Sequence, residues 1–282
     1  MDPQKIYTEV QTRYGHLADE ISATRQSTNE KIANAFGYSA SDLESIPLDA
    51  NLGVSCGNPV AVAKLREGET VVDLGSGGGL DVLLAARKVG VKGKAIGVDM
   101  TRSMINLARK NAAKANLRNT HFIESPITSI PLPDSSTDCI ISNCVINLVP
   151  SAEKHLVFAE MFRILKPGGR VAVSDILARR ELPWDLVENM ALYMGCIAGA
   201  RRVCEYEEFL KGVGFQDILI VDTEKDLNAY KDLVQSQAQT GCCSQSNSKS
   251  NENENEQKSE TRPAEINFND WAGSFQIYAI KP

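Results

Sequence analysis

The sequence predicts an α/β protein built on a doubly wound, mainly parallel sheet. A β-branched run at 70–74 is followed by a glycine-rich turn and then by the apolar helical pattern of 80–87. Strand and helix patterns then alternate as far as residue 176, with short turns between them. Such alternation indicates parallel strands joined by right-handed crossovers. The same region, 67–180, is therefore expected to form the central domain.

The first 66 residues carry helical patterns without strands, and we expect them to form an N-terminal helical cap with the segment that leads into the sheet. Ser27 and Glu30 have the spacing of a capping box, and Gly37 is a candidate helix stop. Asn58 and Pro59 predict the N-cap and first residue of a helix that reaches Leu65. The cap either packs near a ligand pocket or only covers a sheet face. Its apolar stripe is formed by Tyr7, Val10, Tyr14, Leu17 and Ile21.

The central domain is expected to place its ligand at the carboxyl ends of the strands, near the point where the strand order reverses. Gly75, Asp99, Ile127 and Asn143 all follow or end predicted strands. The predicted strands are 70–74, 94–99, 120–124, 138–143 and 170–176, with helices from 80 to about 89, from 101, and at 151–165, and a turn at 166–169.

The remaining residues divide by composition into three parts. Region 181–235 is expected to hold helices at 182–194 and 205–213, an irregular stretch at 195–200, and a sixth strand at 215–222. Region 236–264 is rich in Ser, Asn, Gln, Glu and Lys, and we interpret it as a disordered low-complexity insertion. Region 265–282 holds a terminal strand at 271–280, an antiparallel strand addition, so the insertion is expected to join two antiparallel edge strands.

Composition excludes several classes of partner. A net charge of −6 and a pI of about 5.3 argue against binding to nucleic acid or to an anionic membrane. No apolar run approaches the ~20 residues that a membrane span requires, and the first residues have no apolar signal region. Seven cysteines, an odd number, favour reduced thiols and a cytoplasmic location over a disulfide framework.

The glycine-rich turn reads Asp73-x-Gly75-x-Gly77-x-Gly79, which fails the Gly-x-Gly-x-x-Gly pattern of dinucleotide-binding proteins. It resembles motif I of the class I S-adenosylmethionine methyltransferases, whose fold is a Rossmann-like sheet of this kind. Asp99 ends the next strand, about 24 residues after Gly75, near the spacing of a ribose-binding carboxylate. The alternative is an ordinary glycine turn. The resemblance implies S-adenosylmethionine as methyl donor.

Three cysteines stand in motifs of their own. Cys144 follows the fourth strand, where a buried small hydrophobe is the more common fate of a free cysteine. Cys56 and Cys196 are flanked by glycine in loops, which is unusual for core residues. The elements Ser-Cys-Gly, Asn-Cys-Val-Ile-Asn-Leu and Gly-Cys-Ile-Ala-Gly-Ala resemble the cysteine signature of the arsenite methyltransferases. This resemblance runs from about Val54 to Phe215.

The resemblance implies methyl transfer from S-adenosylmethionine to arsenic(III) held by Cys56, Cys144 and Cys196, giving methylated arsenicals in arsenic detoxification. Thiolates are soft ligands that suit trivalent arsenic, whose lone pair can attack the methyl group without a general base. The implied partners are arsenite or its thiol conjugates and a thiol reductant such as thioredoxin or glutathione, which reopens a disulfide left by the reaction. No metal cofactor is implied, and no oligomeric state is indicated.

The motif positions also imply the cofactor contacts. Asp99 is matched to the ribose, and Asn143 to the methionine portion. An acid at position 73 can instead hold the loop by accepting hydrogen bonds from its backbone. The full implied set is Asp73, Gly75, Gly77, Asp99, Met100, Ile127, Thr128 and Asn143.

The chain departs from the family pattern at several positions. No cysteine precedes Cys56, and Val54 stands where an aromatic residue is usual. The pair Cys242-Cys243 either captures arsenite or is an ordinary exposed pair, Cys139 is expected in the core, and Cys204 has no assigned role. Two other functions stay open: a C- or O-methyltransferase of another small molecule, and a non-catalytic thiol-based metalloid-binding protein.

Overall fold

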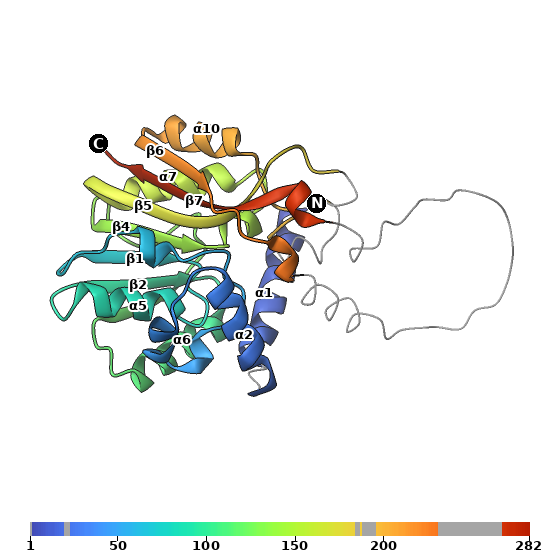
Figure 1. Cartoon of the computed structure of the whole chain (residues 1–282). Coiled ribbons are helices and arrows are strands. Elements are labelled where there is room, and N and C mark those ends of the chain that lie inside the picture. The colour runs from blue at the N-terminus through green and yellow to red at the C-terminus, as the bar shows by residue number, and fades with distance from the viewer. Residues whose placement is uncertain (1, 20–22, 184–186, 188–195, 231–266) are drawn as a thin grey trace, which may run out of the picture.

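The computed structural model describes residues 2–19, 23–183, 187, 196–230 and 267–282. Its centre is a seven-stranded sheet with the order β3-β2-β1-β4-β5-β7-β6 (Figure 1). Strands β1 to β5 are parallel where they pair, and β7 is antiparallel to both β5 and β6. The strands are β1 Thr70–Leu74, β2 Lys94–Asp99, β3 Thr120–Glu124, β4 Thr137–Asn143, β5 Leu165–Ala178, β6 Gln216–Asp222 and β7 Ala272–Ile280.

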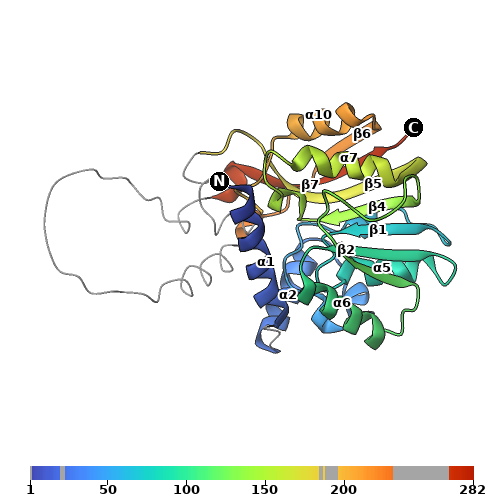
Figure 2. The same ribbon diagram turned by 180° about the vertical axis from the view of Figure 1, so that it is seen from behind.

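Helices cover both faces of the sheet (Figures 1 and 2). Alternate side chains of each strand enter opposite cores, so Val71 packs on one face and Val72 on the other. The first face is covered by α4 Pro59–Val62, α5 Leu80–Val89 and α6 Arg102–Lys114, and the second by α7 Lys154–Ile164 and α10 Val203–Val213. This is the doubly wound class I methyltransferase architecture that the sequence predicts.

The N-terminal cap lies across the carboxyl ends of the strands (Figure 2). It consists of α1 Pro3–Asp19, α2 Ala23–Ala35 and α3 Ala40–Glu44. Ile6 and Val10 of α1 join a third apolar cluster with Ile32 and Phe36. Short 3₁₀-helices lie at Leu48–Ala50, Ile146–Leu148, Leu227–Tyr230 and Phe268–Asp270. The cap therefore closes the edge of the sheet at which a ligand is expected.

One prediction about the sheet is wrong. The expected turn at 166–169 lies inside β5, because Leu165 pairs with Thr137 and the register shifts before Cys139. The N–H of Gly168 donates to the carbonyl of Lys281 at 2.8 Å, so this stretch keeps strand pairing through the irregularity. The terminal strand β7 is an antiparallel addition, as predicted; it lies between β5 and β6, which leaves β6 at the edge.

The cap region differs from its prediction in two details. Ser27 lies inside α2, so the predicted capping box is wrong, whereas Gly37, with a φ of 103°, does follow the helix end. Asn58 caps α4 through a 3.0 Å bond from the N–H of Ala61. That helix ends at Val62 rather than Leu65, and Lys64 adopts a left-handed φ of 46°.

Several predictions fall outside the part of the chain that the structure describes. These are the insertion at 236–264 with Cys242 and Cys243, almost all of the helix at 182–194, and Ile21. Among the described residues, no helix has both the length and the apolar character that crossing a bilayer requires.

Candidate functional site

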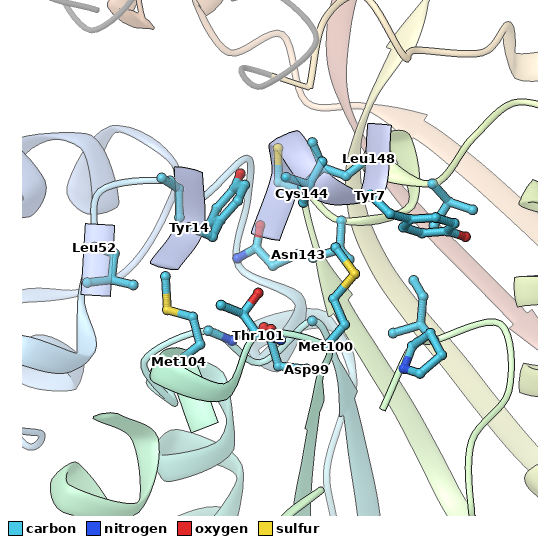
Figure 3. A pocket seen from close by; sticks show the side chains of 18 of the residues that line it. Tyr7, Tyr14, Leu52, Asp99, Met100, Thr101, Met104, Asn143, Cys144 and Leu148 are labelled. Atoms are coloured by element: carbon cyan, nitrogen blue, oxygen red, sulfur yellow. Dashed lines mark hydrogen bonds between the residues drawn. The ribbon is translucent and has the colours of Figure 1, made fainter. Parts of the chain in front are cut away.

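A cavity opens at the carboxyl ends of the strands, between the glycine turn and the cap (Figure 3). This is the edge at which open α/β sheets bind their ligands. Helix α1 contributes Tyr7 and Tyr14 to its wall. Most of the cofactor residues that the sequence implies line this cavity: Gly75, Gly77, Asp99, Met100, Ile127, Thr128 and Asn143.

The glycine turn brings bare backbone against the cavity. Gly75 has a φ of 71°, and a Cβ there would collide with the side chain of Val145. Gly77 has a φ of 49°, and a Cβ there would stand in the cavity, 3.9 Å from Cδ1 of Leu52. The N–H groups of Gly75 and Ser76 both donate to the carbonyl of Val98, which fastens the turn to β2. The turn thus leaves room for a ligand that lies directly on the main chain.

Asp99 shapes the cavity as well as facing it. Its carboxylate accepts hydrogen bonds from the N–H of Gly77 at 3.0 Å and of Thr101 at 2.8 Å. Burial raises the pKa of Asp99, and these two hydrogen bonds oppose the shift. A carboxylate has about four acceptor positions, so two bonds leave capacity for ligand hydroxyls.

Asp73 is placed differently from its prediction. It is buried at the end of β1 but does not line the cavity. Its pKa is raised well above the usual value, first by burial and then by the nearby carboxylates of Asp81 and Asp99. Of the two motif carboxylates, Asp99 is the one that lines the cavity.

The three motif cysteines come together beside the cavity. The Sγ atoms of Cys56, Cys144 and Cys196 all lie within 4.8 Å of one another. Cys56 belongs to the loop before α4, Cys144 follows β4, and Cys196 begins the turn that leads to α10. Cys144 itself lines the cavity, so the cluster adjoins the space that the glycine turn borders (Figure 3).

Two of these cysteines are bonded to each other. Cys56 and Cys144 form a disulfide, with Cα atoms 5.4 Å apart, although the sequence predicts reduced thiols. That prediction is wrong for this pair, because the fold brings together two residues that are 88 positions apart. Cys196 keeps its thiol, which donates to the carbonyl of Cys144 at 2.9 Å.

The cluster lies in an apolar environment. All three cysteines are buried and belong to the apolar cluster that α1 and α2 complete. Burial raises the pKa of Cys196 well above its usual value, and the nearby carboxylate of Asp175 adds to the rise. The free thiol is therefore protonated at neutral pH.

Asn143 connects the cysteine cluster to the cavity. Its Oδ1 accepts from the N–H of Cys56 at 2.9 Å, and its Nδ2 donates to the carbonyl of Gly57 at 2.9 Å. Nδ2 also lies 2.8 Å from the hydroxyl of Tyr38, which donates to Asp81 at 2.7 Å. Asn143 thus holds the Cys56 loop while it lines the cavity, a double role that its position in the sequence does not reveal.

The remaining residues of the site differ in how far the sequence indicates them. Tyr7 and Tyr14 belong to one apolar stripe of the predicted N-terminal helix, and both line the cavity. Tyr38 and Asp81 lack a sequence signal, because they meet only through the fold. Cys139 is buried in the core as predicted, where burial raises its pKa to about 12. Cys204 is exposed on α10.

Comparison with known proteins identifies the family. The profile of a family described as "Methyltransferase domain" matches residues 65–256, which is more than half of the chain. This chain belongs to the methyltransferase family. The match begins just before β1, so it includes the glycine turn, Asp99 and two of the three motif cysteines of the methyltransferase.

Several relatives of this methyltransferase carry a more specific name. An arsenite methyltransferase of Halobacterium salinarum is 42% identical over 77% of this chain and 54% of its own length. One of Mus musculus is 32% identical over 76% of this chain and 59% of its own. The chain therefore spans less than two thirds of the length of these relatives. A ubiquinone/menaquinone C-methyltransferase of Vibrio cholerae is 37% identical over 39% of this chain and 42% of its own length.

A solved structure extends the comparison to the fold. The arsenic(III) S-adenosylmethionine methyltransferase of Chlamydomonas reinhardtii superposes with a TM-score of 0.59 at 26% identity. The alignment covers 90% of this methyltransferase and 73% of that chain. The similarity thus extends beyond the glycine turn to nearly the whole chain.

Proposed function

We propose that this chain transfers the methyl group of S-adenosylmethionine to trivalent arsenic that is bound by Cys56, Cys144 and Cys196. The observation that carries the proposal is the convergence of three Sγ atoms within 4.8 Å of one another beside the cavity that the glycine turn borders. The names of the relatives support the same substrate. A glycine-lined cavity alone supports methyl transfer in general, and the thiols make arsenic the acceptor.

The cavity fits S-adenosylmethionine. Gly77 leaves open the space that a Cβ would fill, and Asp99 offers acceptor positions to ribose hydroxyls. Met100 and Ile127 supply apolar contacts for the adenine, and Asn143 lies on the side of the cavity nearest the thiols. When bound, the cofactor supplies an electrophilic methyl group.

The thiols bind and orient the arsenic. Each protonated thiol can replace one hydroxyl of arsenite, forming an As–S bond and releasing one water molecule, so the raised pKa of Cys196 is no obstacle. Thiolates are the soft ligands that trivalent arsenic prefers. Three of them leave the arsenic lone pair directed outward, toward the cavity that Cys144 lines. Because no proton leaves the nucleophile, the residues need only provide proximity and orientation.

The Cys56–Cys144 disulfide indicates how electrons enter the cycle. Methyl transfer raises arsenic to the pentavalent state, and two thiolates that leave as a disulfide return two electrons to it. A thiol reductant such as thioredoxin or glutathione must then supply two electrons and two protons to reopen the bond. We place this reaction in the cytoplasm, where such reductants are kept, and assign it to arsenic detoxification.

The test uses purified protein, methyl-labelled S-adenosylmethionine, arsenite and glutathione. We expect label in methylated arsenicals only when both arsenite and the reductant are present. Transfer only to an added quinone precursor would favour the carbon methyltransferase alternative that the Vibrio cholerae relative suggests. Tight arsenite binding without transfer of label would leave a metalloid-binding protein.

A further inference from the structure

Cys196, the third cysteine of the cluster, is held in place by contacts that take no part in the proposed methyl transfer. Cys196 has a φ of 63° and Cys144 a φ of 60°, both in the left-handed region. Residues with a Cβ rarely adopt this conformation, and they keep it only where surrounding contacts impose it. Some part of the fold must therefore hold the backbone in place at both cysteines.

The contacts come from Asn147, three residues after Cys144. Its Nδ2 lies 3.1 Å from the carbonyl oxygen of Cys196, 2.6 Å from that of Ile176 and 3.0 Å from Oδ1 of Asp175. One amide thus joins the loop of Cys144, the end of β5 and the turn of Cys196. Asn143 plays no part here, since its bonds go to Cys56, Gly57, Tyr38 and Asp81.

Asn147 is itself fixed by a network of fully buried polar side chains. The hydroxyl of Tyr206 donates to Oδ2 of Asp175 at 2.9 Å and lies 3.4 Å from Oδ1 of Asn147. Lys154 donates to the carbonyl of Ile146, next to Asn147, at 2.7 Å. Asn147, Asp175, Tyr206 and Lys154 are all 0% exposed. Such a network is costly to bury unless its members are bonded to one another, so it defines one position for the amide.

We propose that Asn147 is a positioning residue that holds the Cys196 turn beside Cys144, so that arsenic receives its third thiolate. This inference rests on the proposed function and adds the residue that sets the number of As–S bonds. Cys56 and Cys144 have separate support, because Asn143 binds the Cys56 main chain and the N–H of Cys144 donates to Ser174. Loss of Asn147 should therefore release one thiol and leave the other two in place.

The test compares Asn147→Ala with Asn119→Ala. The amide of Asn119 also donates to two main-chain carbonyls, those of Ala86 and Gly90, at 2.8 and 2.9 Å, and it lies between α5 and β3. Each reduced protein is loaded with one equivalent of arsenite, and X-ray absorption at the arsenic edge counts the sulfur neighbours. We expect three As–S bonds in the wild type and in Asn119→Ala, and two As–S bonds with one As–O bond in Asn147→Ala.

Two further measurements separate positioning from general damage. Asn147→Ala should lower arsenite turnover by about 100-fold, the scale of a misplaced reacting group, with unchanged S-adenosylmethionine affinity. Tyr206→Phe keeps the ring and removes only the hydroxyl, so it tests the network even where Asn147→Ala does not fold. It should weaken arsenite binding by about 10-fold through the loosened amide.

Each outcome has one meaning. Three As–S bonds in Asn147→Ala, or wild-type arsenite affinity in Tyr206→Phe, would overturn the role of Asn147 and leave the proposed function intact. Fewer than three As–S bonds in the wild type would instead overturn the three-thiolate function itself, and this inference with it.

Discussion

The cofactor cavity and the cysteine cluster are neighbours, but they are held in different ways. The cavity takes its form from the main chain: the left-handed glycines 75 and 77 and the ends of β1 and β2. The cysteine cluster depends on the side-chain amides of Asn143 and Asn147, which fasten segments that are far apart in the sequence. The glycine turn is thus local and built from backbone, whereas the cysteine cluster is long-range and held by side chains.

This difference implies that each region can be damaged without the other. Residues 70–101 supply the turn, Asp99 and their mutual bonds, so this part of the cavity wall is formed within one βαβ unit. The cluster needs the loop of Cys56, the end of β4 and the turn after β5 at the same time. Substitutions in one region should therefore leave binding at the other unchanged.

The largest effect is expected from Cys144→Ser and Cys196→Ser. Either variant loses one of the thiolates that the proposed arsenic site requires, and arsenite methylation should fall by at least about 100-fold. The affinity for S-adenosylmethionine, measured by calorimetry, should stay at the wild-type value. Near-normal turnover by either variant would show that the thiols do not share one arsenic.

Cys56→Ser should separate two arsenic substrates. Monomethylarsenite has only two positions left for thiolates, so Cys144 and Cys196 suffice for it, whereas arsenite has three. We expect turnover of arsenite to fall much more than turnover of monomethylarsenite. Equal losses with the two substrates would contradict this division of roles.

Asp81→Asn tests the buried carboxyl that binds Asn143, the residue between the two regions, and Tyr38. Burial raises the pKa of Asp81 from 3.8 to about 6, so the folded protein holds this proton more tightly than the unfolded chain. The carboxyl therefore contributes stability that is fully present below about pH 4 and is lost as the pH rises through about 6. The difference of about two pKa units corresponds to on the order of 3 kcal/mol.

Urea unfolding from pH 4 to pH 7 measures this effect. The stability of the wild type relative to Asp81→Asn should fall across the range, because the amide does not titrate. The asparagine keeps a side-chain oxygen that can accept a hydrogen bond from the hydroxyl of Tyr38. The variant therefore retains a partner for the 2.7 Å bond that Asp81 makes in the wild type. Parallel stability curves for the two proteins would show that Asp81 does not titrate in this range.

Asp99→Ala should weaken S-adenosylmethionine binding by about 1.5–3 kcal/mol, because ribose hydroxyls lose a charged acceptor. Part of the loss should come from the glycine turn, since the same carboxylate holds the N–H of Gly77. Asp99→Asn, which keeps one acceptor oxygen, is the matched control and should lose less. Calorimetry with unchanged affinity in Asp99→Ala would remove this residue from the cofactor site.

The smallest effect is expected from deletion of residues 244–262, which lie outside the described part of the chain. Their polar composition predicts a flexible insertion, and shortening such a loop changes its closure free energy by only about 0.6 kcal/mol per halving. Thermal unfolding should shift little, and both cofactor affinity and the As–S count should persist. A large drop in melting temperature would show that this segment packs on the domain.

The same contrast explains which features were predictable from the sequence. The bounds of β1, β2 and β3 follow from their β-branched runs and turns. The glycines after β1 indicate a ligand-binding turn, because glycine adopts such positive φ values without strain. The place of β7 between β5 and β6 was missed, because a strand pattern does not name its partners.

The cysteine motifs were visible, but the supports beneath them were not. Asn147 belongs to the Asn-Cys-Val-Ile-Asn-Leu element, but the sequence does not reveal its role. Its hydrogen-bond partners lie about 30 and 50 residues farther along the chain. The motif position of Asp73 implies a cofactor contact, but Asp73 is not among the residues that line the cavity. Spacing indicates which residue types are present, and only the packing shows what each one touches.

The position of β7 also sets the order in which the protein can be completed. The hydroxyl of Ser274 in β7 donates to the carbonyl of Cys56 at 2.6 Å, across 218 positions of the chain. During synthesis, β5 has no partner on this side, and the Cys56 loop lacks this anchor, until β7 has been made. Such distant pairing slows folding and leaves a strand edge exposed in the growing chain. A nascent chain can thus form the glycine turn early, but the support of its cysteine cluster is complete only after β7 has paired.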